Sequence, residues 1–175
     1  MSDASDTQSI VQPDLAISVR TATATDASAL AALINRAYAI ESFFVEGDRT
    51  NAGEIERMLD RGTFVVLEHA GGLGAAVYVE RGYFGMLSVL PELQGHGLGK
   101  RLVRIAEAMC ESAGCLEVNM RIINLREELG RWYRSLGYHE VGVTPYEHRP
   151  VKQPCHFVEM RKTLRPITSL DAVAA

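Results

Sequence analysis

The sequence lacks the marks of several common protein classes. No run of about 18 apolar residues is present, so no transmembrane helix is predicted. The first residues, MSDASDTQSIVQPDLA, have neither the basic start nor the apolar stretch of a signal peptide, so a cytoplasmic protein is expected. Lys and Arg form no run and the net charge is −4, which predicts neither a nucleic-acid partner nor a membrane partner.

Cysteine is also scarce. Cys110, Cys115 and Cys155 are odd in number and form no CxxC pair, so neither a disulfide framework nor a zinc knuckle is predicted. His96 has no histidine or acidic residue at ligand spacing, which favours a role in filling its loop. No metal site is expected.

What the sequence does contain is the composition of one globular domain. Its 175 residues are 47% hydrophobic and 23% charged, which is enough to build a substantial core. Residues 1–16 and 165–175 are polar, and we predict that they form mobile tails on either side of a single domain over residues 17–164.

The periodicity of the apolar residues predicts a mixed α/β fold. Helical patterns follow Asp26, Asn51 and Gly97, and a further helix carries Leu129 and Tyr133 on one face. Strands are predicted at residues 17–21, 64–68, 73–80, 83–90, 116–122, 138–143 and 156–160. The order β-α-α-β-β-β-α-β-α-β-β predicts a mixed sheet with helices on both faces.

A glycine-rich turn, residues 94–99 (QGHGLG), lies between a predicted strand and a predicted helix. Free N–H groups at a helix start bind anions, and glycines let a phosphate approach the backbone closely. The turn is not a P-loop, because the first glycine of that pattern would fall on Gln94 and Arg101 replaces Ser or Thr. It is not a dinucleotide fingerprint either, since the third glycine would fall on Lys100.

The turn instead fits the pattern Q/R-x-x-G-x-G/A and leads into an amphipathic helix, and it resembles the acetyl-CoA pyrophosphate loop of the GNAT N-acetyltransferases. The resemblance extends over residues 17–164 and implies the GNAT-like acyl-CoA N-acyltransferase fold, with acetyl-CoA as cosubstrate. It implies that main-chain amides from Gly95 to Lys100 hold the pyrophosphate and that the Val89 N–H faces the thioester oxygen. The cofactor-binding residues implied are Leu87, Ser88, Val89, Gln94, Gly95, His96, Gly97, Leu98, Gly99 and Lys100.

The same resemblance points to an acid for the departing thiolate. The segment WYRSLGY, residues 132–138, is similar to a family segment whose tyrosine protonates the thiolate, which places Tyr133 in that role. Asn124 lies nine residues before Tyr133, rather than the seven common in the family, so a cofactor role for Asn124 is not carried over.

The base that deprotonates the amine is not evident from the sequence. Tyr83 stands where some family members have a glutamate. Ordered water or a backbone carbonyl can serve instead, and Glu41, Glu46 and His156 are further candidates.

The acceptor site is expected from the segment between the first two helices, residues 38–51. Phe43 and Phe44 are predicted to wall a pocket. Glu41, Glu46 and Asp48 are predicted to attract an ammonium group. The expected function is direct acetyl transfer in a ternary complex to the primary amine of a small molecule. Two alternatives stay open: acetylation of a protein N-terminus or lysine, and a CoA-binding sensor without catalysis. Homodimers are common in the family.

Overall fold

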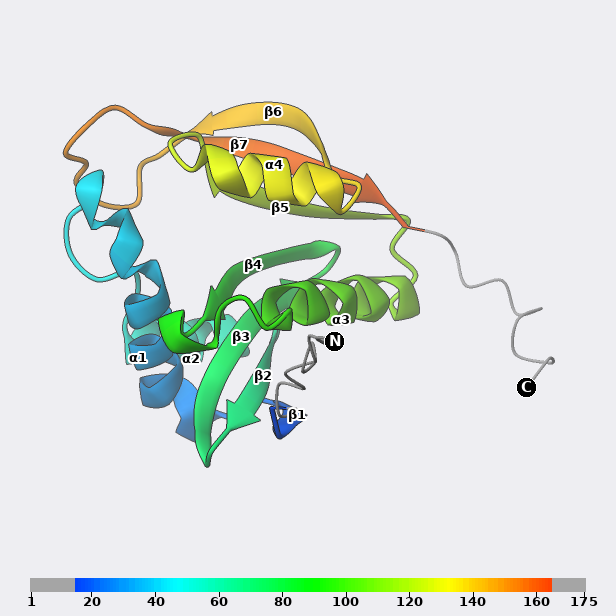
Figure 1. Ribbon diagram of the computed structural model, residues 1–175. Coiled ribbons are helices and arrows are strands. Elements are labelled where there is room, and N and C mark those ends of the chain that lie inside the picture. The colour runs from blue at the N-terminus through cyan, green and yellow to red at the C-terminus, as the bar shows by residue number, and fades with distance from the viewer. Residues whose placement is uncertain (1–14, 165–175) are drawn as a thin grey trace, which may run out of the picture.

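The computed structural model describes residues 15–164, and the two predicted tails lie outside it apart from residues 15 and 16. The predicted order of elements is confirmed (Figure 1). The helices and strands are β1 (Ile17–Thr21), α1 (Ala27–Ala37), α2 (Ala52–Leu59), β2 (Thr63–His69), β3 (Gly72–Glu80), β4 (Tyr83–Val89), α3 (Leu98–Ser112), β5 (Glu117–Ile123), α4 (Glu127–Ser135), β6 (His139–Pro145) and β7 (His156–Thr163). Short 3-10 turns are η1 (Ala24–Asp26), η2 (Tyr38–Phe43) and η3 (Pro91–Leu93).

The strands form one mixed sheet in the order β1-β2-β3-β4-β5-β7-β6. Neighbouring strands pair antiparallel except β4 and β5, which are parallel and meet at a single register pair, Tyr83 and Asn119. Beyond that pair the two strands diverge, and the sheet opens between them (Figure 1).

The helices begin where the sequence predicts. The Asn51 side chain accepts a hydrogen bond from the Glu54 N–H at 3.0 Å and caps α2. The Thr23 N–H donates to Asp26 at 2.8 Å in a capping box just before α1. Gly97, with φ of 76°, is the N-cap of α3. These local devices set the helix starts without help from the rest of the fold.

The helices cover both faces of the sheet, as predicted. Helices α1 and α2 pack on one face with Phe64, Val66 and Tyr78. On the other face α3 packs over β3 and α4 lies over β5, where Gly130 is next to Ile122 (Figure 1). Because side chains alternate along a strand, successive residues of β2 and β3 enter opposite cores. The strand predicted at residues 116–122 begins one residue later, at Glu117, and Leu116 before it is 63% exposed, outside the buried face that Val118, Met120 and Ile122 form.

Candidate active site

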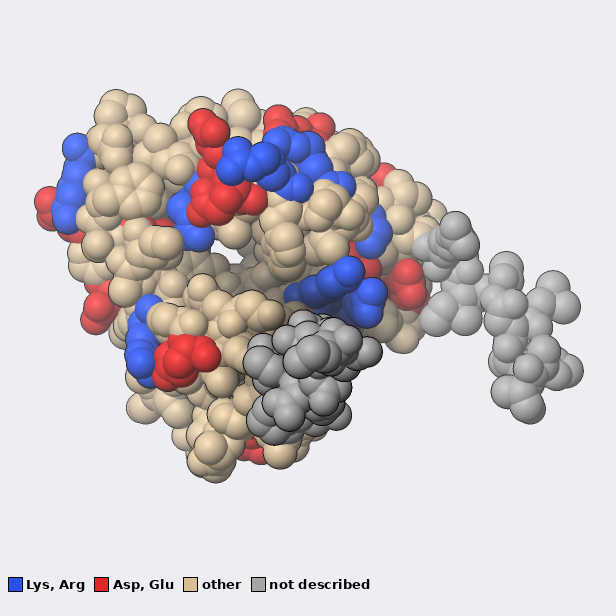
Figure 2. Space-filling model, in the orientation of Figure 1, with Lys and Arg blue, Asp and Glu red and all other residues tan. Residues whose placement is uncertain are grey.

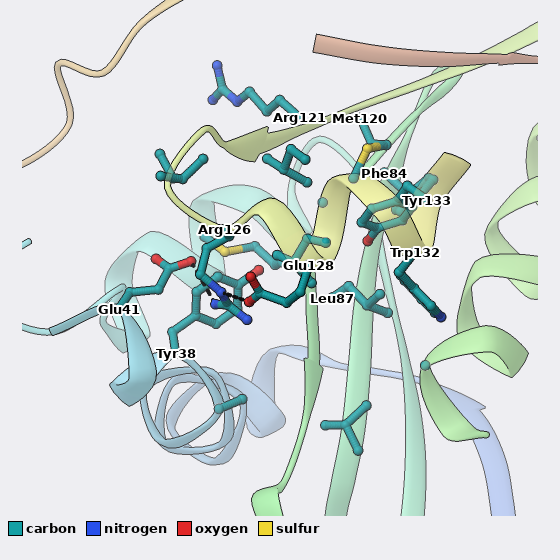
Figure 3. Close-up of a pocket in the computed structure, with 18 of the residues that line it drawn as sticks. Tyr38, Glu41, Phe84, Leu87, Met120, Arg121, Arg126, Glu128, Trp132 and Tyr133 are labelled. Atoms are coloured by element: carbon teal, nitrogen blue, oxygen red, sulfur yellow. Dashed lines mark hydrogen bonds and ion pairs between the residues drawn. The ribbon is translucent and has the colours of Figure 1, made fainter. Parts of the chain in front are cut away.

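A cavity of about 630 Å³ lies where β4 and β5 diverge. Its walls come from β4, the glycine turn, the start of α3, β5, α4, and the segment after α1. Figure 2 shows an opening through the molecule, and Figure 3 shows Trp132 and Tyr133 on one side of the cavity with Tyr38, Glu41 and Arg126 on the other. This volume is typical of a site for a small molecule.

Strand β4 carries a bulge beside this cavity. Ala76 pairs with Ser88 and Tyr78 with Gly85, so Met86 and Leu87 together oppose a single residue of β3. Met86 has a φ of 50°, and the Ser88 hydroxyl donates to its carbonyl at 2.9 Å. The bulge changes the direction of β4 just beyond its pairing with β5.

The bulge has a consequence for the backbone at the end of β4. The Leu90 N–H donates to the Gly74 carbonyl at 2.9 Å, toward β3. By the alternation of an antiparallel strand, the N–H of Val89 therefore points the other way, toward the space that β5 leaves open. A main-chain donor is thus directed to the cavity, which Val89 and Leu87 both line.

The glycine turn presents further main-chain donors. Gly95 and Gly97 have φ of 80° and 76°, a backbone conformation that glycine adopts without strain. The first α3 bond runs from the Arg101 N–H to the Gly97 carbonyl at 3.0 Å, so the preceding amides of the first turn have no partner within the helix. The Gln94 side chain donates to the Val89 carbonyl at 3.2 Å and thereby ties the turn to the end of β4.

Most residues named from the sequence line this cavity. Those are Leu87, Val89, Gln94, Gly95, Gly97, Leu98, Gly99, Lys100, Tyr133 and Glu41. Two residues of the turn region do not. Ser88 is 1% exposed and its hydroxyl is used by the bulge, whereas the His96 ring faces the Leu93 and Gln94 carbonyls at 3.3 and 3.0 Å.

Of the residues predicted for the acceptor site, only Glu41 lines the cavity. Phe44 is fully buried and packs with Val45, Ile123 and Phe157, so it belongs to the core instead of a pocket wall. Asp48 is exposed, and its contact is a hydrogen bond that its carbonyl accepts from Arg149. Of the candidate bases, Glu46 and His156 are exposed and away from the cavity, and Glu41 lines it.

Tyr133 is held by other aromatic rings. Its ring lies 4.7 Å from that of Trp132, 5.6 Å from Tyr138 and 6.2 Å from Phe84, measured between centroids. The residue is 3% exposed, and Figure 3 shows its hydroxyl on the cavity side of the ring. Burial raises the pKa of Tyr133 well above 10, with smaller contributions from Tyr38 and Tyr83, so the phenol stays protonated at neutral pH.

The side of the cavity opposite Tyr133 is charged; the sequence analysis named Glu41 there but missed Arg126 and Glu128. Arg126, just before α4, lies 3.6 Å from Glu41 of η2 and also hydrogen-bonds Glu128 of α4 (Figure 3). Burial raises the pKa of Glu41 above its usual value of 4.5, partly offset by Arg49, Arg126 and Arg149. The signal available in the sequence was the charged turn LREELG directly after a buried strand.

Two loops meet over this charged side. The segment after η2 and the β6–β7 loop join through a bridge between Val45 and Val151. The Lys152 N–H donates to the Phe44 carbonyl at 2.8 Å, and the Glu46 N–H donates to the Pro150 carbonyl at 3.1 Å. These backbone bonds hold together two segments that are far apart in the sequence and that adjoin the cavity-lining residues Glu41, Arg49 and Tyr146.

Comparison with known proteins adds to this geometry. Residues 60–140, which span the bulge, the glycine turn, α3, β5 and α4, match the family model of the acetyltransferase (GNAT) domain. The chain carries a GNAT acetyltransferase domain. The GNAT family predicted from the glycine turn is therefore confirmed. The predicted enzyme class, an acetyl-CoA-dependent N-acetyltransferase, is confirmed with it.

Solved structures share the fold of this GNAT domain. The ribosomal-protein-S18-alanine N-acetyltransferase of Escherichia coli superposes with a TM-score of 0.68 at 16% identity, covering 88% of this chain and 97% of that one. A Salmonella typhimurium protein described as an acetyltransferase and solved with its cofactor acetyl-CoA gives 0.69 at 17% identity, with coverage of 90% and 99%. An N-acetyltransferase of Staphylococcus aureus gives 0.70 at 12% identity, with coverage of 85% and 99%. No curated protein matches the sequence.

Residues 15–164 contain neither a membrane-spanning helix nor a metal-binding cluster. No helix among them is both long and apolar enough to cross a membrane. No group of three or more His, Cys, Asp or Glu side chains in that range is placed to hold a metal ion.

Proposed function

We propose that this GNAT domain acetylates the primary amine of a small molecule by direct attack on acetyl-CoA in a ternary complex. The observation that carries the proposal is the single cavity that the glycine turn, the Val89 amide, Tyr133 and Glu41 share. The amides of the glycine turn, the Val89 N–H, the Tyr133 hydroxyl and the Glu41 carboxylate thus line one space.

The cosubstrate fits the side of the cavity at the glycine turn. In the proposal, the free amides of residues 95–100 bind the pyrophosphate, and Lys100 lies in the first turn of α3 to attract it. Leu87 and Val89 then flank the pantetheine arm. Ser88 and His96 are proposed to act through loop structure only, Ser88 by its bond to the Met86 carbonyl.

Two donors serve the acetyl transfer itself. The Val89 N–H stabilises the oxyanion that forms on the thioester carbonyl, a contribution of roughly 3–4 kcal/mol for one fixed donor. The attacking nitrogen forms the new amide bond as the carbon–sulfur bond breaks, and Tyr133 gives its proton to the departing sulfur. Because the pKa of Tyr133 is raised, the proton is present at neutral pH and is delivered as charge develops on sulfur.

Glu41 is proposed as the group that receives the ammonium proton. It is 6% exposed and lines the cavity, and the other two candidate bases do not line it. An alkylammonium of pKa about 10.4 is mostly charged at neutral pH, so an anionic neighbour both attracts it and favours its deprotonation on attack.

The joined loops favour a small acceptor over a peptide. A peptide needs an open groove, and the backbone bonds from Phe44 to Lys152 and from Glu46 to Pro150 join two loops on the acceptor side. A cytoplasmic location and a homodimer stay predictions.

A panel of amines with acetyl-CoA tests the proposal. Release of CoA thiol and an acceptor mass gain of one acetyl group are expected for small primary amines and not for N-terminal or lysine peptides. Binding of acetyl-CoA without thiol release from any amine would favour the sensor alternative.

Replacing Glu41 with Gln is expected to lower kcat/KM about 100-fold at neutral pH, because general-base catalysis contributes at least that factor. Burial raises the pKa of Glu41 above 4.5, so the carboxylate becomes protonated at a higher pH than an exposed glutamate does. The wild-type rate is therefore expected to fall as the pH is lowered through that raised pKa. The variant should lose that acidic limb in a pH–rate profile. Glu46→Gln, at an exposed site off the cavity, is the control, and an acidic limb that persists in Glu41→Gln contradicts the role.

A further inference from the structure

The acceptor side of the cavity has more positive than negative charge. Its charged lining residues are Glu41 and Glu128 against Arg49, Arg121 and Arg126. Arg126 is neutralised, because it lies against both Glu41 and Glu128. Two guanidinium groups, those of Arg49 and Arg121, are left over.

Neither of these arginines has an acidic partner within the described part of the chain. No ion pair within 4.0 Å forms at Arg49 or Arg121 among residues 15–164. Glu159 is opposite Arg121 in the β5–β7 register, but it accepts a hydrogen bond from the Thr144 hydroxyl at 3.3 Å. The nearest acid across the sheet is therefore directed elsewhere.

Both guanidiniums are nevertheless held in place. Arg121 lies over the Phe157 ring at 4.3 Å, and its Nη2 is 3.3 Å from His148 Nε2. Arg49 lies over the Tyr38 ring at 5.3 Å. A guanidinium over an aromatic ring is attracted by the ring face, and its N–H groups can still bind a ligand.

His148 is a polar neighbour of Arg121. Burial lowers the pKa of His148, the positive charges of Arg121, Arg49 and Arg149 lower it further, and the negative charge of Glu147 raises it. A neutral imidazole accepts the hydrogen bond from Arg121 and adds no charge of its own. Arg121 thus contacts a side chain of the β6–β7 loop, and Arg121 and Arg49 both line the same cavity.

We propose that the acceptor is an amino acid, whose carboxylate binds Arg121 and Arg49 while its amino group faces Glu41 and Glu128. This inference rests on the proposed function. A carboxylate accepts two parallel hydrogen bonds from a guanidinium edge, and the acids on the same side of the cavity complement the ammonium. Three arginines against two acids leave one net positive charge on this side, so a simple amine would raise the net charge to two, whereas a zwitterion leaves it unchanged.

The test compares amino acids with the amines that lack only the carboxylate. Suitable pairs are tyrosine with tyramine, lysine with cadaverine, and 4-aminobutyrate with propylamine, assayed by CoA thiol release. In at least one pair the acid is expected to have a kcat/KM about 10- to 100-fold higher, the range for a charged hydrogen-bonded pair. Arg121→Gln should remove most of this preference, by lowering kcat/KM for the acid without lowering it for the amine of the pair.

The control is Arg57→Gln, at an exposed position of α2 that does not line the cavity, which should keep the preference. Equal rates for acid and amine in every pair, or an equal loss for both in Arg121→Gln, would overturn the inference while the proposed function stands. If no acceptor is turned over, the proposed function fails. Calorimetry of the CoA-loaded protein with N-acetyltyrosine and N-acetyltyramine then decides the inference: tighter binding of the acid that Arg121→Gln abolishes supports it, and equal binding overturns it.

Discussion

Replacing Tyr133 with Phe is expected to lower kcat by about 100-fold or more and to leave the affinity for acetyl-CoA within about twofold. A positioned general acid contributes roughly 10²- to 10⁴-fold, and the substitution removes only the proton that the departing thiolate would take. The ring keeps its contacts with Trp132, Tyr138 and Phe84, so the fold and the cavity shape are retained. Steady-state CoA release and calorimetry with acetyl-CoA measure the two quantities separately.

The pH dependence makes this prediction sharper. Because burial raises the pKa of Tyr133 well above 10, its hydroxyl stays protonated between pH 6 and about 9.5. The wild-type enzyme should therefore show no alkaline loss from this group across that range. A plateau at high pH in the wild type, together with a uniformly low rate in Tyr133→Phe, is the expected pair of profiles.

Tyr138→Phe is the matched control. Tyr138 belongs to the same aromatic cluster, but its hydroxyl donates to Glu107 at 2.8 Å and it does not line the cavity. We expect this variant to lose about 1–3 kcal/mol of the free energy of unfolding, since the hydrogen bond is to a charged group, with kcat unchanged. A similar fall in kcat in both variants would show that packing of the cluster, and not proton transfer, limits the rate.

Features that are specified by residues close together in the sequence could be predicted from it. The glycine turn is specified by consecutive residues, because positive φ at Gly95 and Gly97 and the helix behind them need no distant partner. The caps at Asn51 and Asp26 are local for the same reason. The WYRSLGY segment likewise placed Tyr133 on the cavity, since its helix has one buried face.

The acceptor side could not be predicted in this way. Phe43 and Phe44 are adjacent and chemically identical, yet Phe43 is 50% exposed and Phe44 fully buried, because only Phe44 meets Ile123 and Phe157 in the folded chain. The contact of Arg126 with Glu41 likewise joins α4 to η2, which no sequence spacing relates. Features made by tertiary contact leave no periodic signal, and these are the features that shape the acceptor pocket.

Replacing Gly97 with Val is expected to raise the dissociation constant for acetyl-CoA about 100-fold. Gly97 has a φ of 76°, which a β-branched residue adopts only with strain, so the first turn of α3 should shift and its free amides lose their alignment. Loss of two hydrogen bonds to a charged phosphate, at about 1.5 kcal/mol each, corresponds to that factor. Calorimetry with acetyl-CoA measures the change.

The difficulty with this variant is that strain alone destabilises the protein, by about 1–2 kcal/mol. Gly71→Val separates the two effects, because Gly71 has a φ of 80° in the β2–β3 turn, away from the cavity, and an added Cβ there, as at Gly97, meets no atom within 4 Å. The two variants should therefore lose similar stability in thermal unfolding, while only Gly97→Val loses acetyl-CoA binding. Equal affinities would mean that the amides of the glycine turn do not hold the pyrophosphate. In that case Tyr133 and the Val89 N–H would face a thioester positioned by some other part of the cavity.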